Sequence, residues 1–209
     1  MIDLYSWPTP NGQKIHIMLE ECGLNYQVQP VNISQNEQFA PAFLAISPNN
    51  KIPAMVDAEG PDGRPIALFE SGAILQYLAD KCQRFGGDTP RQRYSVLQWL
   101  MFQMGGFGPM LGQAHHFRKF APQAHPYAIT RYSEEAQRLY RVLNTQLQQQ
   151  SYVAAEEYTI ADIALFPWCR RHEWQGVDLR DFPHVLRWYE TIEARPAVQR
   201  GLQVLQNPV

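Results

Sequence analysis

A proline stands at the start of a short apolar strand, and it restricts the backbone conformations that this part of the chain can adopt. Pro53 precedes Ala54-Met55-Val56, and the residues before it, Ser47-Pro48-Asn49-Asn50, form a turn motif. A proline cannot donate a ladder hydrogen bond, so this position suits a backbone that faces a ligand instead of another strand. The segment therefore predicts that an extended, peptide-like ligand lies along Ile52.

A second segment predicts a site for the negatively charged end of such a ligand. The apolar run Ile66–Phe69 stops at Glu70-Ser71, and a helical pattern follows it. Ser71 is a favourable N-cap residue, and Gly72 allows a ligand to approach the backbone closely. Because a helix N-terminus binds anions, we expect a carboxylate near Ser71.

The order of elements predicts two domains. Strands at 2–6 and 26–33 flank a helix that ends at Gly23, and a hairpin of strands 54–57 and 66–69 precedes another helix. This βαβ-ββα order predicts an α/β thioredoxin-like domain over residues 1–82. Glycine, proline and polar residues predict a linker over 83–90, and helical patterns predict an all-α domain over 91–209. In that second domain, Thr159 and Asp162 form a capping box that starts a helix.

Composition excludes several classes of function. The chain has 209 residues, of which 45 % are hydrophobic, and a net charge of −2 with no basic run, which argues against nucleic-acid binding. No apolar run is long enough to span a membrane, and the N-terminus has no signal-peptide pattern. The three cysteines fit no metal-binding spacing, so we expect no metal and a reducing, cytoplasmic location.

Several ordered motifs together resemble one family. They are Met1-Ile2-Asp3-Leu4-Tyr5, Thr9-Pro10-Asn11-Gly12, Ser47–Pro53, Glu70-Ser71 and Gly105–Gln113. This set, at these spacings, resembles the bacterial nu-class glutathione transferases, which are related to the fungal nitrogen-regulator prion protein. The resemblance covers nearly the whole chain and implies the glutathione transferase fold, glutathione as cosubstrate and a homodimer.

The resemblance also implies where the sulfur of glutathione reacts. A free thiol has a pKa of about 8.5, so the protein must stabilise the thiolate with hydrogen-bond donors and a helix N-terminus. The candidate donors are Tyr5, Ser6, Thr9 and Asn11. Thr9 and Asn11 match the catalytic loop of the nu-class branch. Tyr5 lies inside an alternating strand pattern, which favours a core role over a catalytic one.

The implied glutathione-binding residues lie in several segments. The main chain of Ile52 would pair with the cysteinyl part of glutathione, Lys51 with its glycyl carboxylate, and Glu70 and Ser71 with its γ-glutamyl end. The full implied set comprises Asn11, Gln38, Lys51, Ile52, Pro53, Glu70, Ser71 and Arg131.

The implied activity is glutathione-dependent thiol–disulfide oxidoreduction that uses the thiol of bound glutathione, with reduction of organic hydroperoxides as a further activity. No cysteine lies in the loop at residues 7–12, so a protein thiol is not expected to react. Two alternatives remain open at this point. One is a transferase that conjugates glutathione to electrophiles, and the other is a glutathione-binding regulatory protein with little turnover.

Overall fold

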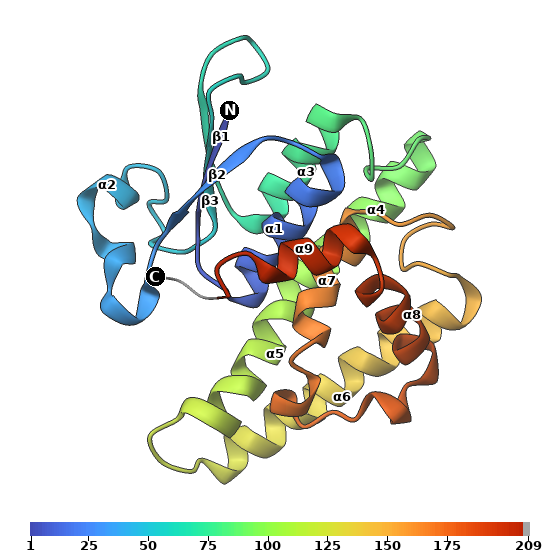
Figure 1. Cartoon of the computed structure of the whole chain (residues 1–209). Coiled ribbons are helices and arrows are strands. Elements are labelled where there is room, and N and C mark those ends of the chain that lie inside the picture. The colour runs from blue at the N-terminus through green and yellow to red at the C-terminus, as the bar shows by residue number, and fades with distance from the viewer. Residues whose placement is uncertain (207–209) are drawn as a thin grey trace. The chain divides into compact units, whose positions relative to one another are not determined.

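The computed structural model describes residues 1–206, which form two compact units (Figure 1). The first unit contains Met1–Arg84 and the segment that begins at Arg195, and the second contains Phe85–Ala194. The strands and α-helices of the first unit are β1 (Ile2–Ser6), α1 (Pro10–Cys22), β2 (Tyr26–Pro30), α2 (Pro41–Leu44), β3 (Ala54–Asp57), β4 (Ile66–Phe69), α3 (Ser71–Cys82) and α9 (Pro196–Gln203).

The four strands form one mixed sheet in the order β2-β1-β3-β4. β1 runs parallel to β2, and β3 runs antiparallel to both β1 and β4. This topology confirms the predicted thioredoxin-like fold of the N-terminal region. Alternation along β1 assigns its two faces: Leu4 is fully buried, and Ser6 contacts His16 of α1, whereas Tyr5 packs against Phe43 of α2. Helices therefore cover both faces of the sheet (Figure 1).

The last helix, α9, packs on α1 and so belongs to the first unit. The guanidinium of Arg195 donates two hydrogen bonds to the Glu21 carboxylate, at 2.6 and 2.9 Å. A Cβ atom on Gly201 would lie 2.7 Å from the Cα of Ile17, so the two helices touch where no side chain fits between them. This arrangement differs from the sequence-based division, which placed all of 91–209 in one domain.

The second unit is helical, which confirms the predicted all-α region. Its α-helices and π-helical turns are α4 (Pro90–Phe102), a π-helical turn (Gln103–Phe107), α5 (Gly108–His115), a second π-helical turn (His116–Phe120), α6 (Pro126–Gln149), α7 (Ile160–Cys169) and α8 (Pro183–Glu193). The glycine-rich segment at 105–108 therefore does not end the helix. It widens one turn of it, which π-helical geometry allows.

Helix α7 is the most deeply buried helix of the second unit, and a capping box starts it. The Asp162 carboxylate is completely buried and accepts hydrogen bonds from the Thr159 backbone N–H at 2.9 Å and the Thr159 hydroxyl at 3.0 Å. It also accepts from the Val153 N–H and from the indole N–H of Trp188, each at 2.9 Å. One side chain thus satisfies donors from the preceding loop, from the start of α7 and from α8.

We expect Asp162→Ala to lower the free energy of unfolding by about 4 kcal/mol, because it leaves several buried donors without an acceptor. Asp162→Asn is the matched control, since its amide oxygen can still accept from Val153 and Trp188. Urea denaturation should give the highest free energy of unfolding for the wild type, a lower value for the Asn variant and the lowest for the Ala variant. An Ala variant within about 1 kcal/mol of wild type would contradict this role.

Residues 1–206 lack two features that would point to other functions. No helix in this part of the chain is both long enough and apolar enough to cross a membrane. Within the same described residues, no group of three or more His, Cys, Asp or Glu side chains is arranged to hold a metal ion.

Candidate functional site

The strand register brings three predicted segments to one edge of the sheet. Tyr5 in β1 is opposite Ala54 in β3, and Ala54 is opposite Phe69 in β4. The chain therefore leaves β1 toward Thr9, enters β3 from Ile52, and leaves β4 toward Ser71, all at this edge. Segments far apart in sequence thus lie together because the strands that carry them end at the same level.

Thr9 caps α1 at this edge and remains able to donate. Its hydroxyl oxygen accepts a hydrogen bond from the Gly12 N–H at 3.2 Å, and the first helical bond runs from the Gln13 N–H to the Thr9 carbonyl at 2.9 Å. A hydroxyl group can accept and donate at once, so the Thr9 O–H can still point to a ligand. Capping and thiolate stabilisation are therefore compatible. Asn11 lies in the first turn, where the positive end of the helix dipole acts.

Gly12 allows the loop before α1 to lie against its first turn. A Cβ atom at this position would be 2.1 Å from the Trp7 carbonyl oxygen and 2.6 Å from the Ser6 hydroxyl oxygen. Any side chain would displace the backbone that presents Thr9. Sequence reasoning named Gly12 within the motif, but the steric reason is visible only in three dimensions.

Two of the four candidate donors are engaged in the core. The Ser6 hydroxyl is buried and lies 2.9 Å from Nε2 of His16, and burial lowers the pKa of His16 to about 4, which keeps that ring neutral. The ring of Tyr5 packs against Phe43 with a centroid distance of 6.3 Å. The core role that the strand pattern favoured for Tyr5 agrees with this packing.

The Ile52–Pro53 peptide bond is cis, and Pro53 is buried. Ile52 precedes the first paired residue of β3 and packs against a small cluster that includes Val31 and Phe43. The Ser47 hydroxyl donates to the Lys51 carbonyl at 2.8 Å, which fixes the turn before this segment. Lys51 itself is exposed. The structure thus holds the Ile52 backbone at the sheet edge and leaves the Lys51 side chain in solvent.

The start of α3 differs by one residue from the prediction. Glu70, not Ser71, is the N-cap. Its backbone dihedral angle φ is 70°, a positive value that residues other than glycine rarely adopt. Such backbone strain is typically retained at functional sites. Ser71 is the first helical residue and is 4 % exposed, while Glu70 is exposed. The Ser71 N-cap assignment was therefore wrong, because β4 turns into the helix through Glu70 itself.

Lys14 is a site residue that sequence reasoning missed. Its side chain is 1 % exposed, and its ammonium donates to the Ser71 hydroxyl oxygen at 3.1 Å. Burial lowers the pKa of Lys14 to about 7, and the nearby Glu70 carboxylate partly opposes this shift. A buried cation thus lies behind the hydroxyl that is expected to meet a carboxylate. The only sequence signal was a lysine among the apolar residues of α1.

The lowered pKa of Lys14 predicts how the free energy of unfolding changes with pH. The unfolded chain holds the lysine proton up to a pKa of about 10.4, whereas the folded pKa is about 7. Between these values the unfolded state binds more protons, so this group makes the free energy of unfolding rise with pH. We expect Lys14→Met to lose that rise, measured by urea denaturation at several pH values from neutral upward. Lys119→Met, at an exposed position, is the control. Equal slopes in wild type and Lys14→Met would refute the shift.

The two remaining predicted residues differ in their surroundings. Gln38 lies in a short 3₁₀ helix (Glu37–Phe39), and its amide oxygen is buried without a hydrogen-bond partner among the described residues. Arg131 is exposed on α6, in the second unit. All the predicted site residues except Arg131 therefore lie in the first unit, and the role of Arg131 stays a prediction.

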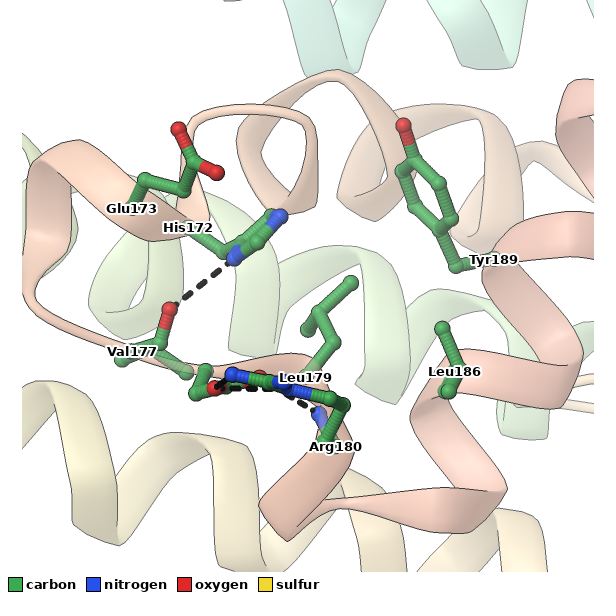
Figure 2. Close-up of a pocket in the computed structure, with 8 residues that line it drawn as sticks. His172, Glu173, Val177, Leu179, Arg180, Leu186 and Tyr189 are labelled. Atoms are coloured by element: carbon green, nitrogen blue, oxygen red, sulfur yellow. Dashed lines mark hydrogen bonds and ion pairs between the residues drawn. The ribbon is translucent and has the colours of Figure 1, made fainter.

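The second unit has a hollow of its own, with a volume of about 360 Å³ (Figure 2). Its polar groups are largely bonded to one another: His172 Nδ1 donates to the Val177 carbonyl at 2.9 Å, and Arg180 Nε lies 2.9 and 3.0 Å from the two Asp178 carboxylate oxygens (Figure 2). The hollow contains none of the predicted site residues. It therefore does not compete with the sheet edge as the candidate site.

Comparisons with known proteins show which family the chain belongs to. Residues 9–81 match the family described as "Glutathione S-transferase, N-terminal domain", and residues 107–196 match "Glutathione S-transferase, C-terminal domain". The disulfide-bond oxidoreductase YfcG of Escherichia coli (strain K12) is 53 % identical over 203 residues, which is 97 % of this chain and 94 % of that protein.

Solved structures extend the similarity to the fold. A glutathione transferase from Pseudomonas putida, with one glutathione disulfide bound per subunit, has a TM-score of 0.93 and 48 % identity, over 97 % of this chain and 91 % of that one. A family member from Pseudomonas fluorescens pf-5, with two glutathione bound, has a TM-score of 0.92 and 50 % identity, over 96 % and 92 %. These matches confirm the resemblance drawn from the motifs, and the chain belongs to the glutathione S-transferase family.

Proposed function

We propose that this chain is a glutathione-dependent thiol–disulfide oxidoreductase in which the thiol of bound glutathione is the reacting sulfur. The observation that carries the proposal is the start of α1: it offers the Thr9 hydroxyl and the helix dipole, and residues 7–12 contain no cysteine. The name of the Escherichia coli relative, a disulfide-bond oxidoreductase, supports the same activity.

Glutathione binds in an extended conformation where β1 and β4 end and β3 begins, beside the segment that leads into β3. The Ile52 main chain, next to Pro53, pairs with the cysteinyl part of glutathione, and Lys51 faces the glycyl carboxylate. Glu70 meets the γ-glutamyl ammonium, and the Ser71 hydroxyl donates to the γ-glutamyl carboxylate. The Lys14 ammonium donates to the Ser71 hydroxyl oxygen and so holds this side chain at the start of α3. Gln38 and Arg131 complete the proposed set.

The reaction begins when glutathione loses its thiol proton at Thr9 and Asn11, whose donors stabilise the thiolate as an oxyanion hole stabilises an oxyanion. The thiolate attacks one sulfur of the disulfide substrate, a new S–S bond forms, and the other sulfur leaves as a thiolate that takes up a proton. A second glutathione thiolate then attacks the mixed disulfide. The products are glutathione disulfide and two substrate thiols. The ligands named for the two Pseudomonas proteins, two glutathione and one glutathione disulfide, suit these reactants and this product.

Three further properties belong to this proposal. The same thiolate can reduce organic hydroperoxides, because the peroxide oxygen is also an electrophile. The protein functions as a homodimer, as the motifs of its nu-class resemblance imply. Its location is the cytoplasm, where glutathione is abundant and thiols stay reduced.

Replacing all three cysteines tests which sulfur reacts. We expect a protein with Cys22, Cys82 and Cys169 changed to alanine to reduce a small disulfide at a rate within about twofold of wild type, because no step uses a protein thiol. The readout is glutathione-dependent reduction of 2-hydroxyethyl disulfide, with circular dichroism as the folding control. A folded variant without this activity would sink the assignment and make a protein cysteine the nucleophile.

A further inference from the structure

Two cysteine side chains meet at the C-terminal ends of neighbouring helices. Cys22 is the last residue of α1, and Cys82 is the last residue of α3. Their Sγ atoms are 2.9 Å apart, although both thiols are free. The sulfurs in a disulfide are about 2.0 Å apart, so little movement separates this contact from a covalent bond.

Other contacts hold the two helix ends at this spacing. The Arg84 guanidinium, just beyond α3, donates to the Glu21 carbonyl of α1 at 3.0 Å. Glu21 is in turn held by Arg195, at the start of α9. These hydrogen bonds fix the backbone at the ends of both helices. The two sulfurs therefore lie opposite each other because the helix ends are held in place, and not only because of one side-chain rotamer.

The two thiols are also accessible, unlike the third. Cys22 and Cys82 are partly exposed, whereas Cys169 is completely buried. Lys81 and Arg84, on either side of Cys82, are exposed, so a charged tripeptide disulfide can approach from that side. Burial, reinforced by the neighbouring Cys82 thiol, raises the pKa of Cys22, which makes Cys22 the poorer first nucleophile.

We propose that Cys22 and Cys82 form a reversible intramolecular disulfide, with glutathione disulfide as the oxidant. The Cys82 thiolate attacks one sulfur of glutathione disulfide, and one glutathione thiolate leaves. The Cys22 thiolate then attacks the mixed disulfide at the Cys82 sulfur, the protein S–S bond forms, and the second glutathione leaves. The protein loses two electrons, glutathione disulfide gains two, and the two cysteine protons pass to the released glutathione thiolates.

This redox site lies apart from the proposed catalytic site. Thr9 and Ser71 are at the N-terminal ends of α1 and α3, so each helix separates the two sites by roughly 16–20 Å along its axis. The disulfide would close a loop from residue 22 to residue 82 that contains β2, β3 and β4. Its effect is therefore on the stability of the glutathione-binding unit, and not on the chemistry of the thiolate.

The test uses the purified full-length protein exposed to glutathione disulfide and analysed without reduction. We expect its mass to fall by two hydrogen atoms, its free thiols, counted in denaturant, to fall from three to one, and peptide mapping to find Cys22 joined to Cys82. Glutathione added in excess should reverse the change. Oxidation should raise the melting temperature by about 10 °C, as expected for a loop of this size.

Single variants serve as matched controls. Cys22→Ser should stop at a mixed disulfide with one glutathionyl group on Cys82, and Cys169→Ser should oxidise as wild type does. Wild-type protein that keeps three free thiols, or that carries glutathionyl groups without the Cys22–Cys82 crosslink, would overturn the proposal. Because the peptide map is made on the wild type, its result does not depend on whether any variant folds.

Discussion

The double variant Thr9→Ala, Asn11→Ala is expected to lower kcat for disulfide reduction about 100-fold or more, while the Kd for glutathione changes by less than about tenfold. Both lost donors act on the thiolate, and removal of one such preorganised donor already lowers turnover by about 10²–10³. The remaining binding groups at Ile52 and Ser71 are untouched. Steady-state kinetics with 2-hydroxyethyl disulfide and calorimetric titration with glutathione separate the two effects.

Thr9→Ser is the matched control for this experiment. Serine keeps the hydroxyl group and also caps a helix well, so most of the activity should remain. The single Thr9→Ala variant additionally loses the cap to Gly12, which is worth about 1 kcal/mol of stability, and thermal melting shows whether that loss matters. Unchanged kcat in a folded double variant would exclude Thr9 and Asn11 as the groups that stabilise the thiolate.

Gly12→Ala is expected to have an effect of similar size by a different route. The added methyl carbon would lie 2.1 Å from the Trp7 carbonyl oxygen, so backbone, and not a flexible side-chain end, has to move. A displacement of about 1 Å at a catalytic group can lower turnover about 100-fold. We therefore expect a loss of kcat together with a lower melting temperature, although no side chain that contacts substrate has changed.

Gly105→Ala provides the comparison for an added methyl group. A Cβ atom there meets nothing within 4 Å, so this variant should melt at or near the wild-type temperature. If Gly12→Ala kept both wild-type turnover and wild-type stability, the loop at Trp7–Thr9 could not be positioned as described. The pair of variants thus distinguishes a steric effect at one position from a general effect of alanine.

Local patterns predicted the parts of the fold that depend on neighbouring residues. Three predictions rested on local chemistry: the strand at 2–6, the hairpin of strands 54–57 and 66–69, and the Thr159–Asp162 capping box. The structure has β1, the β3–β4 hairpin and the start of α7 at these places. The segment at Ile52-Pro53 could also be predicted from local sequence, because a proline at the start of a strand allows few backbone conformations.

Contacts between residues that are distant in sequence could not be predicted from local patterns. Lys14 and Ser71 are 57 positions apart, so nothing in the helical pattern of α1 shows that its lysine reaches the start of α3. The return of α9 to α1 depends on the Arg195–Glu21 pair, which spans 174 positions. The N-cap of α3 was placed one residue too late, because a positive φ at Glu70 contradicts the ordinary preference of a glutamate and is imposed by the surrounding structure.

The most direct test of the proposed activity compares two reactions on one sample. Reduction of 2-hydroxyethyl disulfide by glutathione, coupled to glutathione reductase, runs beside conjugation of glutathione to an aryl halide. Fast disulfide turnover with feeble conjugation is the predicted result. Fast conjugation with little disulfide reduction would contradict it, identify a conjugating transferase and return attention to Tyr5. Binding of glutathione with neither activity would also contradict it and favour a regulatory protein.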